Sequence, residues 1–172
     1  MEVVTGSDAV HAQMLSRLVE QYQTDLLRMC YLYLHDIELA RDAVQETYLK
    51  AYRALDSFRG ECGEKTWLMK IAMNTCRDLR RSAWFRHMDR RVTPEMMPSA
   101  FVAFEEKDEE VLLAVMALPA KLRESVLLYF YQDMSVKEIA QALSVSTSAV
   151  SARLNRAKRK LRIALERRPC HG

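Results

Sequence analysis

The chain has 172 residues, of which 49% are hydrophobic and 28% charged, and its formal net charge is +3. This length fits one compact domain or two small ones, and only 4 glycines and 4 prolines favour helices over sheets. The first residues lack the basic and apolar segments of a signal peptide, and no apolar run is long enough to cross a bilayer. We therefore expect an all-α, cytoplasmic protein without membrane insertion.

The charges are sorted along the chain. Residues 65–91 carry eight Lys or Arg against two acids, and residues 151–168 carry eight against one. Between these basic blocks, residues 95–110 carry six acids against one lysine. This pattern predicts two polyanion-binding surfaces joined by a connector that avoids DNA.

The N-terminal part predicts two helices, or three if the first is divided. Apolar residues recur at helical spacing from residue 9 to residue 34, which indicates core packing and no chemistry. A second helix is predicted over residues 36–54, and its outer face carries Asp42, Gln45, Glu46 and Leu49. A solvated face would explain the charges of this set but explains the exposed leucine less well, so we expect a protein partner here.

A glycine-containing loop over residues 56–67 leads into a basic helix that is predicted from about residue 64 to residue 83. One side of this helix carries Lys70, Asn74, Arg77 and Arg81, with Trp67 at its edge. Single-stranded nucleic acid requires such a set, because cations follow phosphates, an amide contacts a base edge, and a ring stacks on a base for about 1–3 kcal/mol. The alternative, that the tryptophan is a core anchor and the cations are solvated, is equally compatible with the pattern.

The helical pattern stops after Trp84, and Thr93-Pro94 and Met97-Pro98-Ser99 indicate a linker. We accordingly predict an N-terminal domain over residues 1–92, a flexible linker over 93–107 and a C-terminal domain over 108–172. In the last of these, two helices separated at Pro119 are expected to support a helix-turn-helix.

The helix-turn-helix is predicted over residues 135–165. Ser135 and Glu138 have the spacing of a capping box, Ser144-Val145 forms the turn, and Ser146 begins a longer helix. That helix has an apolar stripe and an opposite side with small residues near its start and arginines farther along, which suits a DNA major groove. A helical hairpin with a merely solvated basic face is the alternative.

The remaining polar residues show no arrangement typical of an enzyme or of a metal site. Cys30, Cys62, Cys76 and Cys170 are scattered, so we predict free thiols, with Cys62 in a loop the one most exposed to oxidation. A metal or redox role for Cys170-His171 with Cys62 or Cys76 is a weaker alternative. No nucleophile and base pair, phosphate loop or metal-ligand spacing is present, so we expect no enzyme activity, cofactor or metal.

Several segments together resemble a bacterial extracytoplasmic-function sigma factor of the sigma-70 family. These are Asp42-Ala-Val-Gln-Glu-Thr-Tyr-Leu-Lys-Ala-Tyr52, Phe58-Arg-Gly60, Lys65-Thr-Trp-Leu-Met-Lys-Ile-Ala-Met-Asn74, and Leu118-Pro119 followed by the helix-turn-helix. The resemblance implies two small helical domains joined by a flexible linker, a region 2 domain and a region 4 domain. It also implies three partners, namely core RNA polymerase, promoter DNA and an anti-sigma factor.

The resemblance further implies roles for individual residues. The set Asp42, Gln45, Glu46 and Leu49 would bind the clamp helices of the polymerase β′ subunit. The −10 non-template strand, with one base flipped out, would be bound by Phe58, Arg59, Lys65, Trp67, Lys70, Asn74, Arg77 and Arg81. The −35 duplex would be bound by Ser146, Thr147, Ser148, Ser151, Ala152, Asn155, Arg156 and Arg159. The C-terminal domain would also bind the β flap, and the acidic linker would pass near the RNA exit channel.

Two positions depart from the family pattern. Ser151 stands where the recognition helix often begins with a cation, and Cys62-Gly63 replaces the commoner residues of the base-capturing loop. A free-standing helix-turn-helix repressor or activator that binds a palindrome as a dimer is the alternative function. It leaves the Trp67 helix and the Gln45-Glu46 face unexplained.

Overall fold

The computed structural model describes residues 6–84 and 106–167, and within these ranges it contains helices and no strand. The elements are α1 (Gly6–Leu34), α2 (Ile37–Ala54), the short 3-10 turn η1 (Leu55–Ser57), α3 (Glu64–Trp84), α4 (Glu106–Met116), α5 (Ala120–Val126), the π-helical turn η4 (Leu127–Tyr131), α6 (Val136–Leu143) and α7 (Thr147–Glu166). The predicted all-α class is confirmed.

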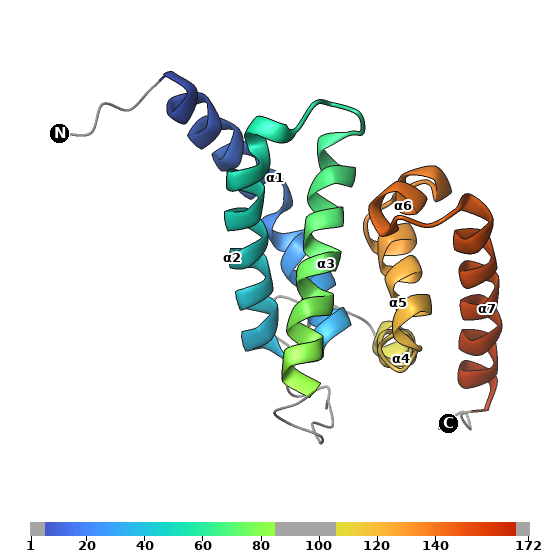
Figure 1. The fold of residues 1–172 in the computed structure, drawn as a ribbon. Coiled ribbons are helices and arrows are strands. Elements are labelled where there is room, and N and C mark those ends of the chain that lie inside the picture. The colour runs from blue at the N-terminus through green and yellow to red at the C-terminus, as the bar shows by residue number, and fades with distance from the viewer. Residues whose placement is uncertain (1–5, 85–105, 168–172) are drawn as a thin grey trace.

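Helices α1, α2 and α3 form the N-terminal half (Figure 1). The first predicted segment is one helix of 29 residues rather than a pair. It ends at Leu34, and the φ of 62° at His35 turns the chain. Asp36 then caps α2 by accepting hydrogen bonds from the amides of Glu38 and Leu39 at 2.9 and 3.0 Å. Apolar side chains of the three helices meet in a buried core that includes Leu26, Leu68 and Met73.

Helices α4 to α7 form the C-terminal half, and its helix-turn-helix has the predicted local signals. Ser135 and Glu138 form the capping box, with the Ser135 amide donating to Glu138 Oε2 at 2.8 Å. These hydrogen bonds hold the pKa of the Glu138 carboxyl below its usual range. Ser144 ends α6 in the left-handed region at φ 54°, and the Ser146 hydroxyl accepts from the Ala149 amide at 3.1 Å to begin α7.

The two halves lie against each other. Helix α3 packs on α6, the C-terminal part of α1 packs on α4, α5 and η4, and α5 lies between α3 and α7 (Figure 1). One connected set of buried side chains runs through both halves. Of the predicted linker, Glu106 and Lys107 belong to α4, and residues 93–105 lie outside the described residues. The helical surfaces of the two halves are therefore partly covered by each other.

Candidate nucleic-acid interface

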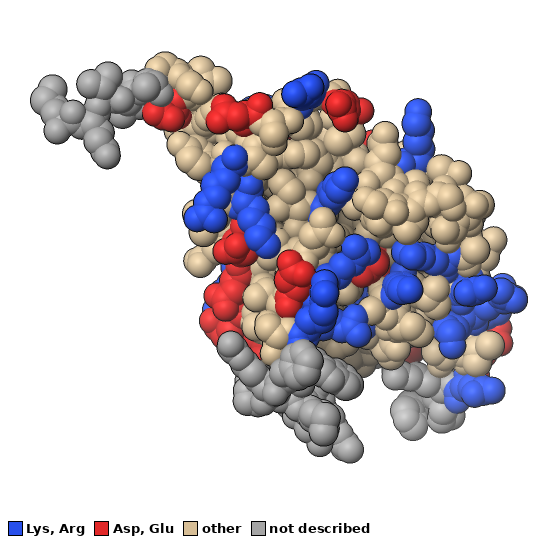
Figure 2. Space-filling model, viewed as in Figure 1, with Lys and Arg blue, Asp and Glu red and all other residues tan. Residues whose placement is uncertain are grey.

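The predicted groove-facing side of α7 is open to solvent. Val150, Leu154 and Ala157 are buried against α4, α5 and α6, which fixes the helix to its own half. All eight residues predicted to bind the −35 duplex are exposed, namely Ser146, Thr147, Ser148, Ser151, Ala152, Asn155, Arg156 and Arg159. Lysine and arginine side chains gather over this helix in Figure 2. Small residues at the start and arginines farther along thus share one accessible face, as a major-groove helix requires.

The residues predicted to bind the −10 strand divide into two groups. Arg59, Lys70, Asn74 and Arg81 are exposed, whereas Phe58, Lys65, Trp67 and Arg77 are half-buried. The rings of Phe58 and Trp67 pack together with centroids 4.7 Å apart and planes at 35°. Trp67 also touches the hydrophobic core, so the structure combines the two alternatives for this residue: it anchors the helix and leaves part of its ring accessible.

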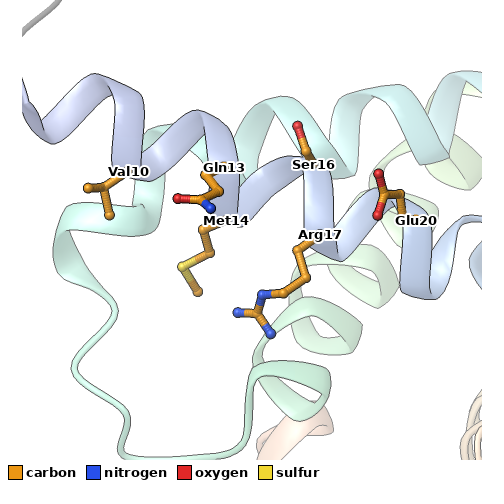
Figure 3. Close-up of a pocket in the computed structure, with 6 residues that line it drawn as sticks. All are labelled: Val10, Gln13, Met14, Ser16, Arg17 and Glu20. Atoms are coloured by element: carbon orange, nitrogen blue, oxygen red, sulfur yellow. The ribbon is translucent and has the colours of Figure 1, made fainter.

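The elements on either side of the loop before α3 are tied to the N-terminal part of α1, through Asp56 of η1 and Glu64 at the start of α3. Arg17 Nη2 lies 2.7 Å from Glu64 Oε1, and His11 Nε2 lies 3.2 Å from Asp56 Oδ1. Beside these contacts is a hollow of about 590 Å³ on α1, lined by Val10, Gln13, Met14, Ser16, Arg17 and Glu20. Figure 3 shows Val10, Met14 and Arg17 pointing from α1 toward the space that the loop encloses. The sequence patterns did not predict this hollow.

The four residues predicted to bind a protein lie together on one groove. Asp42, Gln45, Glu46 and Leu49 of α2 line it with Lys50, and Thr75, Asp78, Leu79 and Ser82 of α3 form the other wall around a volume of about 540 Å³. Leu49 is 52% exposed at this groove. Lys50 Nζ lies 3.8 Å from Glu46 Oε1 and 4.0 Å from Asp78 Oδ2, so charge links the two walls.

Two family models match the chain, one in each half. Residues 18–86 match Sigma-70 region 2, and residues 108–161 match Sigma-70, region 4. RNA polymerase sigma-H factor of Pseudomonas aeruginosa is 30% identical over 163 residues, which cover 87% of this chain and 84% of that protein. ECF RNA polymerase sigma-E factor of Salmonella typhimurium is 30% identical over 155 residues, which cover 82% and 81%. This chain belongs to the extracytoplasmic-function sigma factors of the sigma-70 family.

A solved relative shows the same arrangement of helices. The structure of CnrH in complex with the cytosolic domain of CnrY has a TM-score of 0.71 at 26% identity, covering 90% of this chain and 89% of that chain. Region 2 of the sigma factor comprises most of α1, all of α2 and α3, and region 4 comprises most of α4 to α7. A helix-turn-helix regulator would need only the C-terminal half, so the match to both regions favours the sigma factor over that alternative.

A bidentate ion pair joins region 2 to region 4. Arg77 of α3 donates from Nε and Nη2 to the two carboxylate oxygens of Glu124 of α5, both at 2.8 Å. The Glu124 side chain is only 3% exposed. It also accepts a hydrogen bond from the Tyr33 hydroxyl at 3.1 Å, and the hydrogen bond from Arg77 raises the pKa of that guanidinium. The contact removes Arg77 from the accessible part of the predicted strand path.

A second arginine ties the end of α1 to region 4. Arg123 donates to the carbonyl oxygens of Tyr33 at 3.0 Å, Met116 at 2.7 Å and Leu118 at 3.0 Å. Its guanidinium carbon lies 5.1 Å from the centre of the Tyr33 ring. Burial is the largest of several influences on the Arg123 guanidinium, and it lowers the pKa of this group to about 10.

Two further hydrogen bonds cross between the regions. The Lys65 ammonium donates to the backbone carbonyl of Gln132, and the Gln132 side-chain amide donates to the Asp25 carbonyl at 3.1 Å. Sequence reasoning missed Tyr33, Arg123, Glu124 and Gln132 as members of an interface. The sequence offered one signal, which is that the short segment of α5 carries charges among its apolar residues. The structure buries all of residues 122–126.

The described residues contain no second site built on cysteines or on a metal ion. Cys30, Cys62 and Cys76 are free thiols, and the Sγ atoms of buried Cys30 and Cys76 lie 3.5 Å apart, where their hydrogen bond raises the pKa of Cys30. Cys170 lies outside the described residues. Across residues 6–84 and 106–167, no group of three His, Cys, Asp or Glu side chains could hold a metal ion. Over the same ranges, no helix has the length and apolar character to span a bilayer.

The interface predicts a pH dependence of stability that depends on His35. Burial, with the nearby charges of Arg123 and then Arg80, lowers the pKa of His35 from 6.5 to about 4. The unfolded chain therefore takes up a proton between about pH 6.5 and pH 4 that the folded chain does not, so the free energy of unfolding falls as the pH is lowered through this range. His35→Asn, which tolerates the positive φ, should reduce this fall by on the order of 1 kcal/mol at pH 5 relative to pH 7.

Urea unfolding of both proteins at pH 7 and pH 5 measures the effect. His11→Asn is the control, because it removes a histidine whose contact with Asp56 lies outside the interface. If the free energy of unfolding depends equally on pH in the wild-type protein and in His35→Asn, then His35 is not the source of this dependence.

Proposed function

We propose that this protein directs core RNA polymerase to its promoters by binding the −35 element as duplex through α7 and the −10 non-template strand through α3. The observation that carries the proposal is the presence in one chain of an accessible recognition helix, a separate basic helix with an aromatic pair, and a groove between α2 and α3 that exposes Leu49 among polar residues. The matches to both sigma-70 regions support it. Sigma factors are not enzymes, and we place this one in the cytoplasm, where polymerase and DNA are.

Binding at the −35 element is attributed to the exposed face of α7. Ser148, Ser151 and Ala152 are short enough for close approach of the helix to base edges, and Asn155 can donate to and accept from a base. Arg156 and Arg159 then lie where phosphates pass. With a serine at position 151 in place of a cation, the helix depends more on close packing and less on a guanine contact than a helix with an arginine there.

Binding at the −10 element is attributed to α3 and to the loop that precedes it. Arg59, Lys70 and Arg81 offer charge to the phosphates, Asn74 offers an amide to a base edge, and the Phe58 and Trp67 rings offer a stacking surface. The contacts of Glu64 with Arg17 and of Asp56 with His11 hold the two ends of this loop in place before DNA arrives. Prior ordering lowers the entropy cost of capturing a flipped base, whose extrusion itself costs a few kcal/mol.

Binding to the polymerase is attributed to the groove between α2 and α3. Exposed Leu49 gives the apolar contact, and Asp42, Gln45 and Glu46 give polar contacts around it, a composition typical of protein interfaces. We propose the β′ clamp helices as the partner of this groove and the β flap as a partner of region 4. An anti-sigma factor is proposed as a further partner, supported by the solved complex of CnrH with CnrY.

The contact between regions 2 and 4 would limit access to the −10 strand. Lys65 and Arg77 belong to the proposed strand path, and each is bound by a group of region 4. DNA phosphates would have to replace the Gln132 carbonyl and the Glu124 carboxylate. We infer that binding at the −10 element includes separation of the two halves.

Reconstituted transcription tests the function. The purified protein with core RNA polymerase and a promoter library should give transcripts that begin at specific sites, and neither component alone should do so. Leu49→Glu should lower initiation about tenfold or more, because it places a charge in the apolar centre of the polymerase contact. Val10→Glu is the matched control, since Val10 is an exposed apolar residue away from that groove. Absence of transcripts, with protection of a palindrome by the protein alone, would overturn the proposal.

Replacement of two arginines tests the division of roles between α3 and α7. Arg156→Ala with Arg159→Ala should weaken binding of a −35 duplex by about tenfold to a hundredfold, through loss of phosphate contacts, and should leave −10 single-strand binding intact. Arg41→Ala with Arg53→Ala is the control, because these exposed cations lie on α2 and outside the residues proposed to bind either DNA element. Fluorescence anisotropy with the two DNA ligands measures both affinities. Equal loss of both would exclude the proposed roles.

Neutralising Glu124 tests the closure between the regions. Glu124→Gln keeps the size of the side chain and removes the charge that holds Arg77, so the affinity for the −10 strand should rise by about threefold to tenfold. Glu38→Gln removes a carboxylate from an exposed pair with Arg41 and serves as the control for net charge. The same gain in both variants would show a general charge effect and contradict the closure.

A further inference from the structure

A cationic cleft lies where α3 faces region 4. It has a volume of about 420 Å³ and is lined by Tyr33, Arg77, Arg80, Arg81, Ala120, Lys121, Glu124 and Arg153. Five of these residues are cations and one is an acid. The cations come from both halves of the chain, three from α3, one from α5 and one from α7. Figure 2 shows lysine and arginine side chains on both sides of the boundary between the halves.

Two of the cations are already neutralised. Arg77 is bound to both oxygens of Glu124, the single acid of the cleft, and Arg81 Nη2 lies 3.1 Å from Asp78 Oδ1. Among the described residues, Arg80 donates only to the Tyr33 hydroxyl, at 3.4 Å, and its guanidinium carbon lies 5.9 Å from the centre of the Tyr33 ring. Within the described ranges, no carboxylate lies within ion-pair distance of Arg80, Lys121 or Arg153. Three positive charges therefore face one small space without a counterion from the described chain.

Arg153 shows that the cleft lacks an acceptor. Its Nη1 atom is buried and has no hydrogen-bond partner among the described residues. A buried donor without a partner is unfavourable, and native structures seldom keep one. Arg153 also lies on the flank of α7, about 60° beyond Arg156 and away from Ser148 and Asn155, so the proposed −35 contact does not use it. Arg153 lines the cleft, and a rotation of its side chain that exposes Nη1 would let an anion there supply the missing acceptor.

We propose that this cleft binds a diphosphate anion, either inorganic pyrophosphate or the diphosphate group of a nucleotide, through Arg80, Lys121 and Arg153. Guanidinium groups pair with phosphate oxygens through two parallel hydrogen bonds, and an ammonium adds a point charge. Three cations on opposite walls match two linked phosphates better than a carboxylate, which has one charge and one centre. The Tyr33 ring is only 2% exposed, so no aromatic surface of the cleft is available to stack on a base. The diphosphate is therefore the recognised group.

The bound anion would act as a bridge between the halves. Arg80 belongs to region 2, whereas Lys121 and Arg153 belong to region 4, so one ligand that contacts all three holds α3 against α5 and α7. The Arg77 and Glu124 pair lies in the same cleft and would be retained. The anion-binding site is inferred from the cleft alone, whereas the effect of the anion on −10 strand binding rests on the proposed function.

Calorimetric titration of the full-length protein with pyrophosphate tests the site. The expected result is saturable binding of one anion per chain, with ADP and GDP binding about as tightly as pyrophosphate. Lys121→Gln and Arg153→Gln should each weaken binding by about tenfold to a hundredfold. Lys158→Gln, an exposed cation on the other flank of α7, should change it less than about twofold. Pyrophosphate should also raise the melting temperature of the wild-type protein and not that of Arg153→Gln, which shows by its own melting transition that it is folded.

Three results would overturn the site: absence of saturable binding, equal weakening in Lys158→Gln, or equal affinity for sulfate at the same ionic strength. A second measurement addresses the bridge. Pyrophosphate should weaken binding of a −10 single strand by the wild-type protein, and the Arg153→Gln variant should resist this effect. Unchanged inhibition in that variant would show that the anion competes on α3 alone and would exclude bridging. If the protein binds no −10 strand but titrates with pyrophosphate, the proposed function fails and the site stands.

Discussion

The bidentate contact between Arg77 and Glu124 is the interaction on which the arrangement of the two regions depends. Removing a carboxylate and a guanidinium from water costs several kcal/mol for each ion, and only good geometry with further hydrogen bonds compensates. Both conditions are met, since the two hydrogen bonds measure 2.8 Å and the Tyr33 hydroxyl donates to the same carboxylate. Such a pair adds little net stability when intact, but loss of one partner leaves a buried charge. The contact therefore behaves as a specific and breakable link.

The rest of the interface combines further polar contacts with apolar side chains that connect the cores of the two halves. Arg123 reaches three carbonyl oxygens at the end of α1 and around the turn into α5, and Lys65 reaches the Gln132 carbonyl. Of these acceptors, the Tyr33 and Gln132 carbonyls are bound across the two halves, and each could exchange its partner for water if the halves moved apart. Polar interfaces of this kind are typical of domains that move relative to each other, whereas permanent ones are larger and more apolar. Opening of the link would also expose apolar side chains, because one connected set of buried residues runs through both halves.

The helix-turn-helix could be predicted in detail because its signals are local. The capping box at Ser135 and the apolar spacing on α7 depend on residues within three or four positions of each other, and both are present. The polar face of α3 was also predicted, but what faces it was not. Helical periodicity identifies a side of polar residues without telling whether water, DNA or another helix covers it. Glu124 lies 47 positions from Arg77, and no sequence pattern relates them.

The chemistry of the link explains how DNA could replace it. A carboxylate and a phosphate both present two oxygens to the parallel donors of a guanidinium, so Glu124 occupies Arg77 as a phosphate oxygen pair would. Exchange of one bidentate partner for another conserves the hydrogen bonds of Arg77, and the free energy of opening is then set by the other interface contacts and by rehydration of Glu124. That free energy is the same for every promoter. It lowers the affinity for all −10 strands equally. The ratio of affinities between promoters is then set by the base contacts of Asn74, the aromatic pair and α7.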